Sequence, residues 1–303
     1  MTRARQGDES VPGRAAASAA RDLDALPAAR VVDLLLAQEE AVARAVRRRG
    51  AAIAEAATMV AAALLRGGRL LYAGAGTAGR LATVDAVECA ATFGIPPSRV
   101  MAVVAGGPRA LTHAAAGDED DGHDAEWRLR AAALGPRDVL CVLAPHPCAF
   151  AEAALGYARR RHSRTILLAG SPCPSTAADV VVAAPTGPEA VAGDPWLKSA
   201  TATKLMLAAL STATMVLVGK TYGGVVLDVA PHGPRARARA VDVVREFTGL
   251  DEKAAGALLD RAGGRPKLAI VMHHRRVTRA RAEALVVEHA GRLRAIVGSV
   301  RRT

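Results

Sequence analysis

The sequence predicts an α/β fold in which a parallel sheet is covered by helices on both faces. Short apolar runs have the length of buried strands, at residues 70–73, 100–105, 139–144, 165–169 and 180–184. Apolar residues at helical spacing separate these runs, at residues 79–90, 109–115, 125–134 and 149–160. Such alternation is typical of parallel strands joined by helical crossovers, so we expect three layers with about five strands.

Two helices are expected before the sheet and one long helix after it. Apolar residues recur at helical spacing from Ala28 to Leu65, and Gly67 and Gly68 supply a stop. The long helix, at residues 198–219, holds the longest apolar run of the chain. That run is shorter than the ~20 residues of a membrane span, so we interpret it as a buried helix of a soluble protein.

The chain changes character after Asp228 and predicts a small, mostly helical appendage. RARARAVDVVREFTGL and DEKAAGALLDRAGG are interpreted as helices, KLAIVM as a strand, and TRARAEALVVEHAGRLRAIV as a last helix. The predicted division is a loosely packed arm at residues 1–25, a main domain at 26–240 and the helical domain at 241–303.

Composition argues against several classes of protein. The net charge of +11 invites a nucleic-acid partner, but the basic residues are scattered and only 3% of residues are aromatic. No apolar stretch follows the N-terminal charges, so we expect no signal peptide and a cytoplasmic protein. The spacing of the four cysteines, at 89, 141, 148 and 173, fits neither a C-x-x-C pair nor a zinc module. The sequence predicts no metal, no membrane and no nucleic-acid partner.

The stretch RLLYAGAGTAGRL, at residues 69–81, carries G-x-G-x-x-G directly after an expected strand. A dinucleotide site also needs an acidic residue at the end of the next strand, where this chain has Gly106 and Gly107. An oxidoreductase is therefore disfavoured. A helix N-terminus suits a single phosphate, to which Thr77 can add a hydroxyl. A tight turn without any ligand stays open as an alternative.

The longer stretch GAGTAGRLATVDAVECAATFG resembles the signature of the N-acetylmuramic acid 6-phosphate etherase family, which has the sugar isomerase (SIS) fold. Further segments resemble the family in order and spacing, from about residue 22 to 295: DLDALP, AGGPRALTHAAAGDEDD, GPEAVAG, LKSATATKLMLAALSTATMVLVGKTYGG and LDV. The resemblance implies a SIS-type domain that binds a sugar phosphate and forms a homodimer.

The reaction that the resemblance implies removes D-lactate from carbon 3 of N-acetylmuramic acid 6-phosphate. Opening of the sugar ring to an aldehyde makes the proton on carbon 2 acidic. A base removes this proton, an acid protonates the departing lactyl oxygen, and water adds to give N-acetylglucosamine 6-phosphate. This lyase chemistry of amino-sugar recycling needs two proton-transfer groups and no cofactor.

The resemblance also implies site residues. The catalytic carboxylates match Glu88, within Asp-Ala-Val-Glu-Cys, and Glu119, within Gly-Asp-Glu-Asp. The apolar helix around Glu88 should raise the pKa of this carboxyl group and suit it to the role of acid. The aspartates around Glu119 should raise its pKa toward that of a base working near neutrality. Taken alone, the two patterns also fit a solvated helix face and a polar turn. We expect both carboxylates to face one cleft at the carboxyl ends of the strands.

Substrate contacts are expected from two loops and the long helix, at Gly76, Thr77, Ala78, Gly79, His146, Glu189 and Lys198. The chain departs from the family at its second phosphate loop, which reads roughly A-A-S-G-R-T-P in the family and LAPHPCA here. Pro145 and Pro147 have no amide hydrogen to donate. We therefore expect the amides of residues 75–78 and the Thr77 hydroxyl, rather than residues 145–149, to hold phosphate.

Three hypotheses follow from this departure. An etherase could rebuild its anion site with His146, Lys198 and Arg235; an etherase-like enzyme could take another substrate; or the protein could be a non-catalytic sugar-phosphate regulator, like the animal glucokinase regulators. Both catalytic glutamates are kept, which favours the enzyme, because a pure sensor has no need for both.

Overall fold

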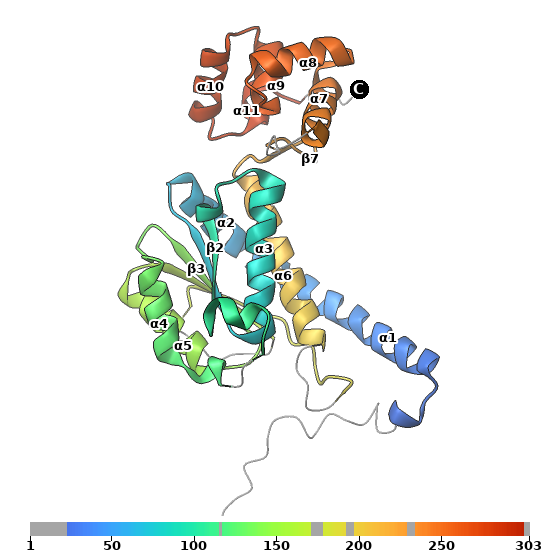
Figure 1. Cartoon of the computed structure of the whole chain (residues 1–303), viewed down its shortest axis with the longest axis vertical. Helices are drawn as coiled ribbons and strands as arrows, with labels where there is room; N and C mark the ends of the chain where they lie inside the picture. The colour runs from blue at the N-terminus through green and yellow to red at the C-terminus, as the bar shows by residue number, and fades with distance from the viewer. Residues whose placement is uncertain (1–22, 115–116, 171–177, 192–196, 229–233, 300–303) are drawn as a thin grey trace, which may run out of the picture.

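The computed structural model describes residues 23–114, 117–170, 178–191, 197–228 and 234–299. The predicted arm at residues 1–25 lies almost wholly outside these ranges, and so does Cys173. A sheet with its flanking helices forms the larger part of the molecule, and a group of C-terminal helices forms the smaller (Figure 1).

Five parallel strands form the central sheet, in the order β2-β1-β3-β4-β5. They are β1 (Leu70–Gly74), β2 (Val100–Val104), β3 (Val139–Ala144), β4 (Arg164–Ala169) and β5 (Val180–Ala183). The predicted parallel sheet is confirmed, and each predicted strand end differs from the observed one by at most one residue. The runs are recognisable because β1 and β3 are buried along their whole length.

Alternate residues of the strands build two separate hydrophobic cores. Leu70 and Tyr72 of β1 pack on one face of the sheet, with α2 (Gly50–Leu65), α3 (Gly76–Phe93) and α6 (Leu197–Leu217). Leu71 and Ala73 pack on the other face, with α4 (Gly122–Ala131) and α5 (Ala149–Arg160). The three-layer α/β architecture predicted from the sequence is therefore confirmed.

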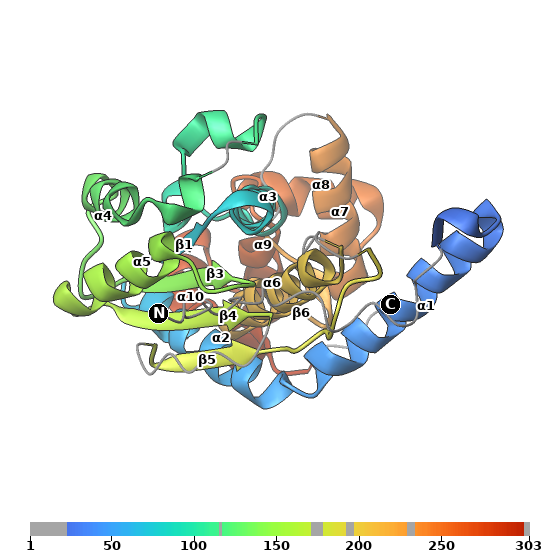
Figure 2. The same cartoon turned by 90° about the horizontal axis from the view of Figure 1, so that it is seen from below.

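Helix α1 (Ala28–Arg47) leaves the body of the molecule (Figures 1 and 2). Only its C-terminal half is buried, through Val42, Ala45 and Val46. Toward the N-terminus, the side chains of Val32 and Leu36 are 53% and 65% exposed. The projecting half of α1 thus carries apolar surface that is not packed against the described part of the chain.

Helix α6 is the one helix among the described residues whose length and hydropathy would allow it to cross a membrane. It lies against α2 and α3, with Met206, Leu210 and Met215 buried in the core. Its apolar composition matches the core helix of an α/β domain, as the sequence predicted.

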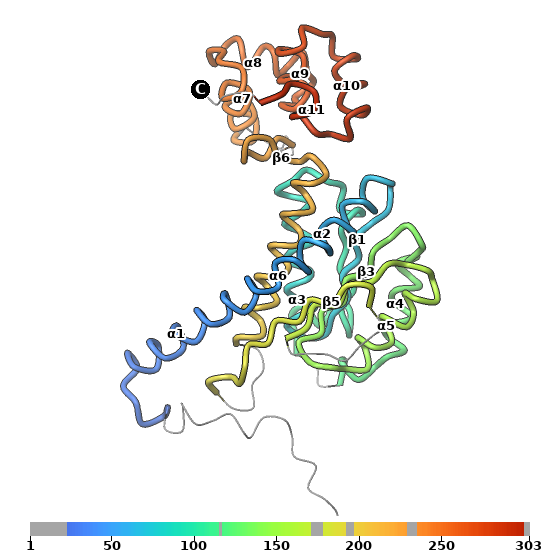
Figure 3. Tube along the Cα trace, turned by 180° about the vertical axis from the view of Figure 1, so that it is seen from behind, coloured from blue at the N-terminus to red at the C-terminus, as the bar shows by residue number. Residues whose placement is uncertain are grey.

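The C-terminal helices have a hydrophobic core of their own and lie beyond the end of α6 (Figure 3). They are α7 (Pro234–Thr248), α8 (Glu252–Arg261), α9 (Pro266–Arg275), α10 (Arg279–Glu288) and α11 (Leu293–Val297). A hairpin of β6 (Thr221–Tyr222) and β7 (Val225–Val226) joins this core through Tyr222, which lies against Phe247.

Two sequence interpretations in this region are wrong. The segment KLAIVM lies at the centre of α9 and is not a strand. The pattern was misread because residues 268–271 are all fully buried. A run buried on every side has no polar face to reveal the helical period. The predicted last helix is two helices, α10 and α11, because the chain turns at Ala290 and Gly291 with φ of 51° and 77°.

A buried ion pair connects the C-terminal helices to the end of α6. The Nζ of Lys267, on α9, donates to the Asp228 carboxylate at 2.8 Å and to the Gly219 carbonyl at 2.8 Å. Lys220 donates to the same carboxylate at 3.1 Å. Burial lowers the pKa of Lys267, whereas the nearby Asp228 carboxylate raises it.

Candidate functional site

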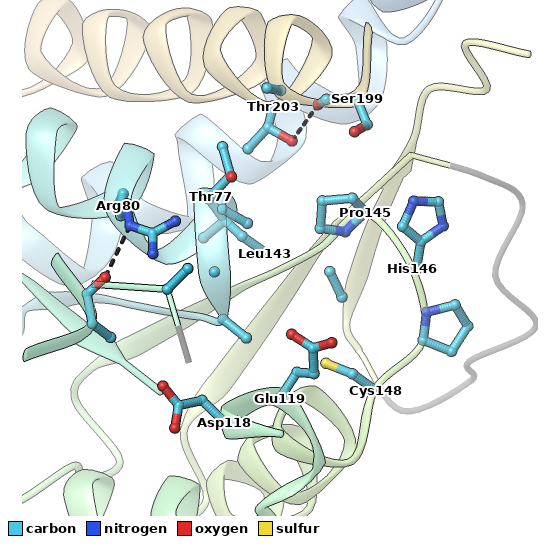
Figure 4. A pocket seen from close by; sticks show the side chains of 18 of the residues that line it. Thr77, Arg80, Asp118, Glu119, Leu143, Pro145, His146, Cys148, Ser199 and Thr203 are labelled. Atoms are coloured by element: carbon cyan, nitrogen blue, oxygen red, sulfur yellow. Dashed lines mark hydrogen bonds between the residues drawn. The ribbon is translucent and has the colours of Figure 1, made fainter. Parts of the chain in front are cut away.

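A cavity of about 440 Å³ opens at the carboxyl ends of the neighbouring strands β1 and β3 (Figure 4). The strand order reverses here, because β2 lies on one side of β1 and β3 on the other. Crossovers that diverge at such a point leave a crevice above the sheet, where open α/β sheets bind their ligands. The fold therefore positions a binding site between the loops that follow β1 and β3.

The first wall of the cavity is the beginning of α3. Gly76, with φ of 52°, starts the helix, and Thr77 and Ala78 follow it along the cavity. Helix α3 can start this close to β1 only because residue 79 is glycine. A Cβ at Gly79 would lie 2.5 Å from the Gly74 carbonyl oxygen and 2.7 Å from Cγ1 of Val104. First-turn amides have no partners within their own helix, so this wall suits an anion.

A second wall is acidic. The short 3-10 helix η5 (Asp118–Asp120) follows Gly117, whose φ is 90°, and contributes all three of its carboxylate residues to the cavity. The carboxyl group of Glu119 lies beside the sulfur of Cys148, the residue directly before α5 (Figure 4). Burial raises the pKa of the Cys148 thiol, and the carboxylate of Glu119 raises it further. The thiol is therefore a neutral neighbour of this glutamate.

The loop after β3 forms a third wall, from Pro145 to Cys148. The predicted residue His146 lies here, between the two prolines (Figure 4). Two of the four residues have no amide hydrogen, so this wall offers an anion fewer donors than the start of α3 does.

Glu88, the other predicted catalytic residue, does not line the cavity. It lies 12 residues beyond Gly76, which is about 18 Å along the axis of α3. The apolar helix expected around Glu88 does not enclose its side chain within one chain, where Glu88 is exposed. Val84 and Val87 are exposed beside it in the sequence, at 58% and 61%. Within one chain the fold does not bring Glu88 and Glu119 to the same cavity.

The carboxylate of α3 that faces the interior is Asp85, three residues before Glu88. It accepts hydrogen bonds from the Tyr72 hydroxyl at 2.7 Å and from the Ser211 hydroxyl at 2.9 Å. Burial raises the pKa of Asp85, while these two hydrogen bonds lower it. Asp85 therefore ties α3 to β1 and to α6, and fixes the helix that starts at the cavity.

Glu189 and Lys198 hold the start of α6 rather than lining the cavity. The Glu189 carboxylate accepts from the backbone amides of Lys198 and Ser199, at 3.0 and 3.1 Å. Lys198 is buried, and its Nζ donates to the carbonyl oxygens of Thr186 and Pro188. Arg235, the other cation considered for an anion site, is exposed on α7. Neither the lysine nor the arginine of this set lines the cavity.

Several cavity residues were not predicted as site residues, among them Arg80, Cys148, Ser199 and Thr203. Ser199 lies on the first turn of α6, and its carbonyl accepts from the Thr203 hydroxyl at 2.8 Å. Arg80 follows Gly79 directly, one helical turn beyond the start of α3. Arg80 could have been predicted from its position in the glycine motif, because side chains on a helix point toward its N-terminus, where the cavity lies.

The parallel sheet with helices on both faces defines a class of protein, the α/β domains of the SIS type. Residues 52–146 match the family described as Glucokinase regulatory protein N-terminal SIS domain. The solved structure of c3406 from E. coli CFT073 is similar in fold, with a TM-score of 0.50 at 17% identity, over 69% of this chain and 100% of that chain.

Curated relatives identify the family within this class. An N-acetylmuramic acid 6-phosphate etherase of Gloeobacter violaceus is 42% identical over 83% of both chains. Etherases of Trichormus variabilis and Actinobacillus pleuropneumoniae are 38% and 37% identical, over 92% and 90% of this chain and 92% and 91% of theirs. The chain belongs to the N-acetylmuramic acid 6-phosphate etherase family, as the resemblance of its sequence motifs indicated.

Proposed function

We propose that this protein cleaves the D-lactyl ether of N-acetylmuramic acid 6-phosphate to give N-acetylglucosamine 6-phosphate and D-lactate. The observation that carries this proposal is a carboxylate, Glu119, in a cavity whose facing wall is a helix N-terminus suited to phosphate. The relatives of that name, 38% identical over 92% of the chain, support the same reaction.

The phosphate of the substrate lies against the first turn of α3, bound by the amides of Gly76 to Ala78 and by the Thr77 hydroxyl. The loop at residues 145–148 takes no part in phosphate binding. Its two prolines support this, because proline has no amide hydrogen to donate. Bound in this way, the open-chain sugar extends from α3 toward the acidic turn. Glu119 is then in position to exchange a proton with the reacting carbons.

The reaction proceeds by elimination and then addition. The proton of carbon 2 goes to a carboxylate, the bond between carbon 3 and the ether oxygen breaks, and that oxygen takes a proton to leave as D-lactate. Water then adds its hydroxyl group to carbon 3 and a proton to carbon 2. Glu119 and Glu88 are the two proton-transfer groups of this scheme.

Glu88 takes part because the enzyme is a cytoplasmic homodimer in which two chains share each site. Glu88 lies on an exposed helix face with Val84 and Val87, and α1 adds the exposed Val32 and Leu36. Apolar surface of this kind marks a surface that binds a partner, and a second copy of the chain is the partner that also supplies Glu88. The free thiols of Cys89 and Cys141 suit a reducing compartment.

Lactate release tests the proposed reaction directly. The purified protein, incubated with N-acetylmuramic acid 6-phosphate, should release D-lactate in step with N-acetylglucosamine 6-phosphate. In heavy water the product should carry deuterium at carbon 2, because the proton lost there is replaced from solvent. Binding of both sugar phosphates without any lactate would instead identify a sugar-phosphate sensor.

Mixing two inactive variants tests whether the site is shared. Glu88→Gln and Glu119→Gln should each be inactive as homodimers. Subunits exchanged between them in equal amounts should recover about a quarter of wild-type activity, because half of the dimers are mixed and each has one intact site of two. A mixture as inactive as its components would show that both glutamates act in the same chain, and an active Glu88→Gln homodimer would show that Glu88 does not act.

A further inference from the structure

The substrate named above carries two anionic groups, the 6-phosphate and the carboxylate of the lactyl ether. The start of α3 accounts for the phosphate. The lactyl carboxylate must enter a cavity that already contains the carboxylates of Asp118, Glu119 and Asp120. Three like charges repel a fourth, so a cation inside the cavity is needed to bind this end of the substrate.

Arg80 lines the cavity and brings a guanidinium group to it. Of the lining residues in the described part of the chain, only Arg80 and His146 have basic side chains. They lie on opposite walls, with Arg80 on the side of α3 and His146 beyond Pro145 (Figure 4). Lys198, the lysine that the sequence predicted as a substrate contact, does not line the cavity, and its Nζ donates to two backbone carbonyls.

Two hydrogen bonds fix the Arg80 side chain in place. Its Nε donates to the Ala110 carbonyl at 2.9 Å and its Nη2 to the His113 carbonyl at 3.4 Å, both in the loop after β2. Nη1 has no acceptor among the described residues. A guanidinium has five N–H groups, so the remaining hydrogens of Nη1 and Nη2 can bind both oxygens of a carboxylate at once.

The position of Arg80 on α3 separates it from the phosphate site. It lies three residues beyond Thr77, about 4.5 Å further along the helix axis. A sugar whose phosphate is bound at the first turn can thus present its carbon 3 substituent to the side chain one turn further on. Because these hydrogen bonds already order the Arg80 side chain, it loses less conformational entropy when a ligand binds.

We propose that Arg80 binds the carboxylate of the lactyl ether and thereby distinguishes the etherase substrate from sugar phosphates that lack this group. The inference rests on the proposed function, since it takes its ligand from that reaction. Arg80 holds the leaving group by the end opposite to the breaking bond, while Glu119 lies on the acidic wall.

A comparison of two ligands tests this role. In a Glu119→Gln background, which prevents turnover, calorimetry would measure binding of N-acetylmuramic acid 6-phosphate and of N-acetylglucosamine 6-phosphate, which has no lactyl group. Arg80→Met should weaken binding of the first ligand by about 10- to 100-fold, as expected for one or more lost charge-assisted hydrogen bonds. Binding of the second should change less than about threefold, because the phosphate contacts remain.

Controls separate this role from a structural one. Arg109 is an exposed arginine in the loop after β2 and does not line the cavity. Arg109→Met should therefore leave both affinities unchanged. Arg80→Lys keeps the charge and should recover part of the lost discrimination. Thermal unfolding of each variant would verify that the loop after β2 is still folded.

Several outcomes would overturn the proposal. Equal weakening for both ligands would assign Arg80 to the phosphate or to the loop, and unchanged affinity for both would remove it from the site. A background protein that does not bind the lactyl sugar would also contradict it. Failure of the proposed reaction has a separate sign, because wild-type protein would then bind N-acetylmuramic acid 6-phosphate and release no lactate.

Discussion

Replacing Glu119 by glutamine should reduce lactate release by about 10²- to 10⁴-fold, the range typical for loss of a general acid or base. Glutamine has nearly the same shape, but its amide cannot accept the proton of carbon 2 or return one to the leaving oxygen. The affinity for N-acetylglucosamine 6-phosphate should change little, because the phosphate contacts lie on α3. Steady-state kinetics together with calorimetry would measure both quantities.

A matched control is available on the next helix. Glu126 lies on α4 outside the cavity and pairs with Arg160 at 2.6 Å on the surface. Glu126→Gln makes the same chemical change without touching the site, and its activity should match the wild type. Activity of the Glu119 variant within about tenfold of wild type would contradict the assignment of Glu119 as a proton-transfer group.

Replacing Asp228 by asparagine should lower the free energy of unfolding by about 3 kcal/mol, at the lower end of the range for breaking a buried ion pair. The loss arises because the side chain of Lys267, only 7% exposed, would keep its ammonium group buried without the carboxylate. Its remaining partners would be neutral oxygens, the Gly219 carbonyl and at most the amide oxygen of the new asparagine. Urea unfolding, followed by circular dichroism, would measure the change.

Two further variants show whether burial is the cause. Lys267→Met should cost less than Asp228→Asn, because it removes the buried charge and leaves Asp228 paired with Lys220. The surface pair of Arg237 and Asp260 serves as the exposed counterpart, and Arg237→Met should change stability little. Equal effects for the surface and buried pairs would refute the argument from burial.

The sequence predicted the sheet well because its strands are apolar runs separated by helical crossovers, and burial on both faces makes such runs continuous. The same reasoning failed at residues 267–272, where a fully buried helix has an equally continuous apolar run. Ala290 and Gly291 break the last predicted helix, and a short alanine-glycine turn gives only a weak signal inside a helical pattern.

The candidate site, like the fold, could be predicted from the sequence only in part. Gly76, Thr77 and Ala78 could be found from a local motif, since one turn of chain contains the whole feature. Glu189 and Lys198 were predicted as ligand contacts, yet the structure pairs them with backbone groups at the start of α6. No spacing in the sequence reveals such partners, because they depend on how residues 186–189 lie against the first turn of α6.

The close contact at Gly79 limits how this part of the chain can evolve. A Cβ there would meet the backbone of Gly74 and the side chain of Val104, so even alanine requires α3 to move away from the sheet. Any such shift would carry Thr77 and Arg80 with it, since both lie on the same rigid helix. Among homologous chains, loss of this glycine should therefore accompany a change of ligand, and the identity of one residue with no polar side chain becomes a marker of substrate divergence.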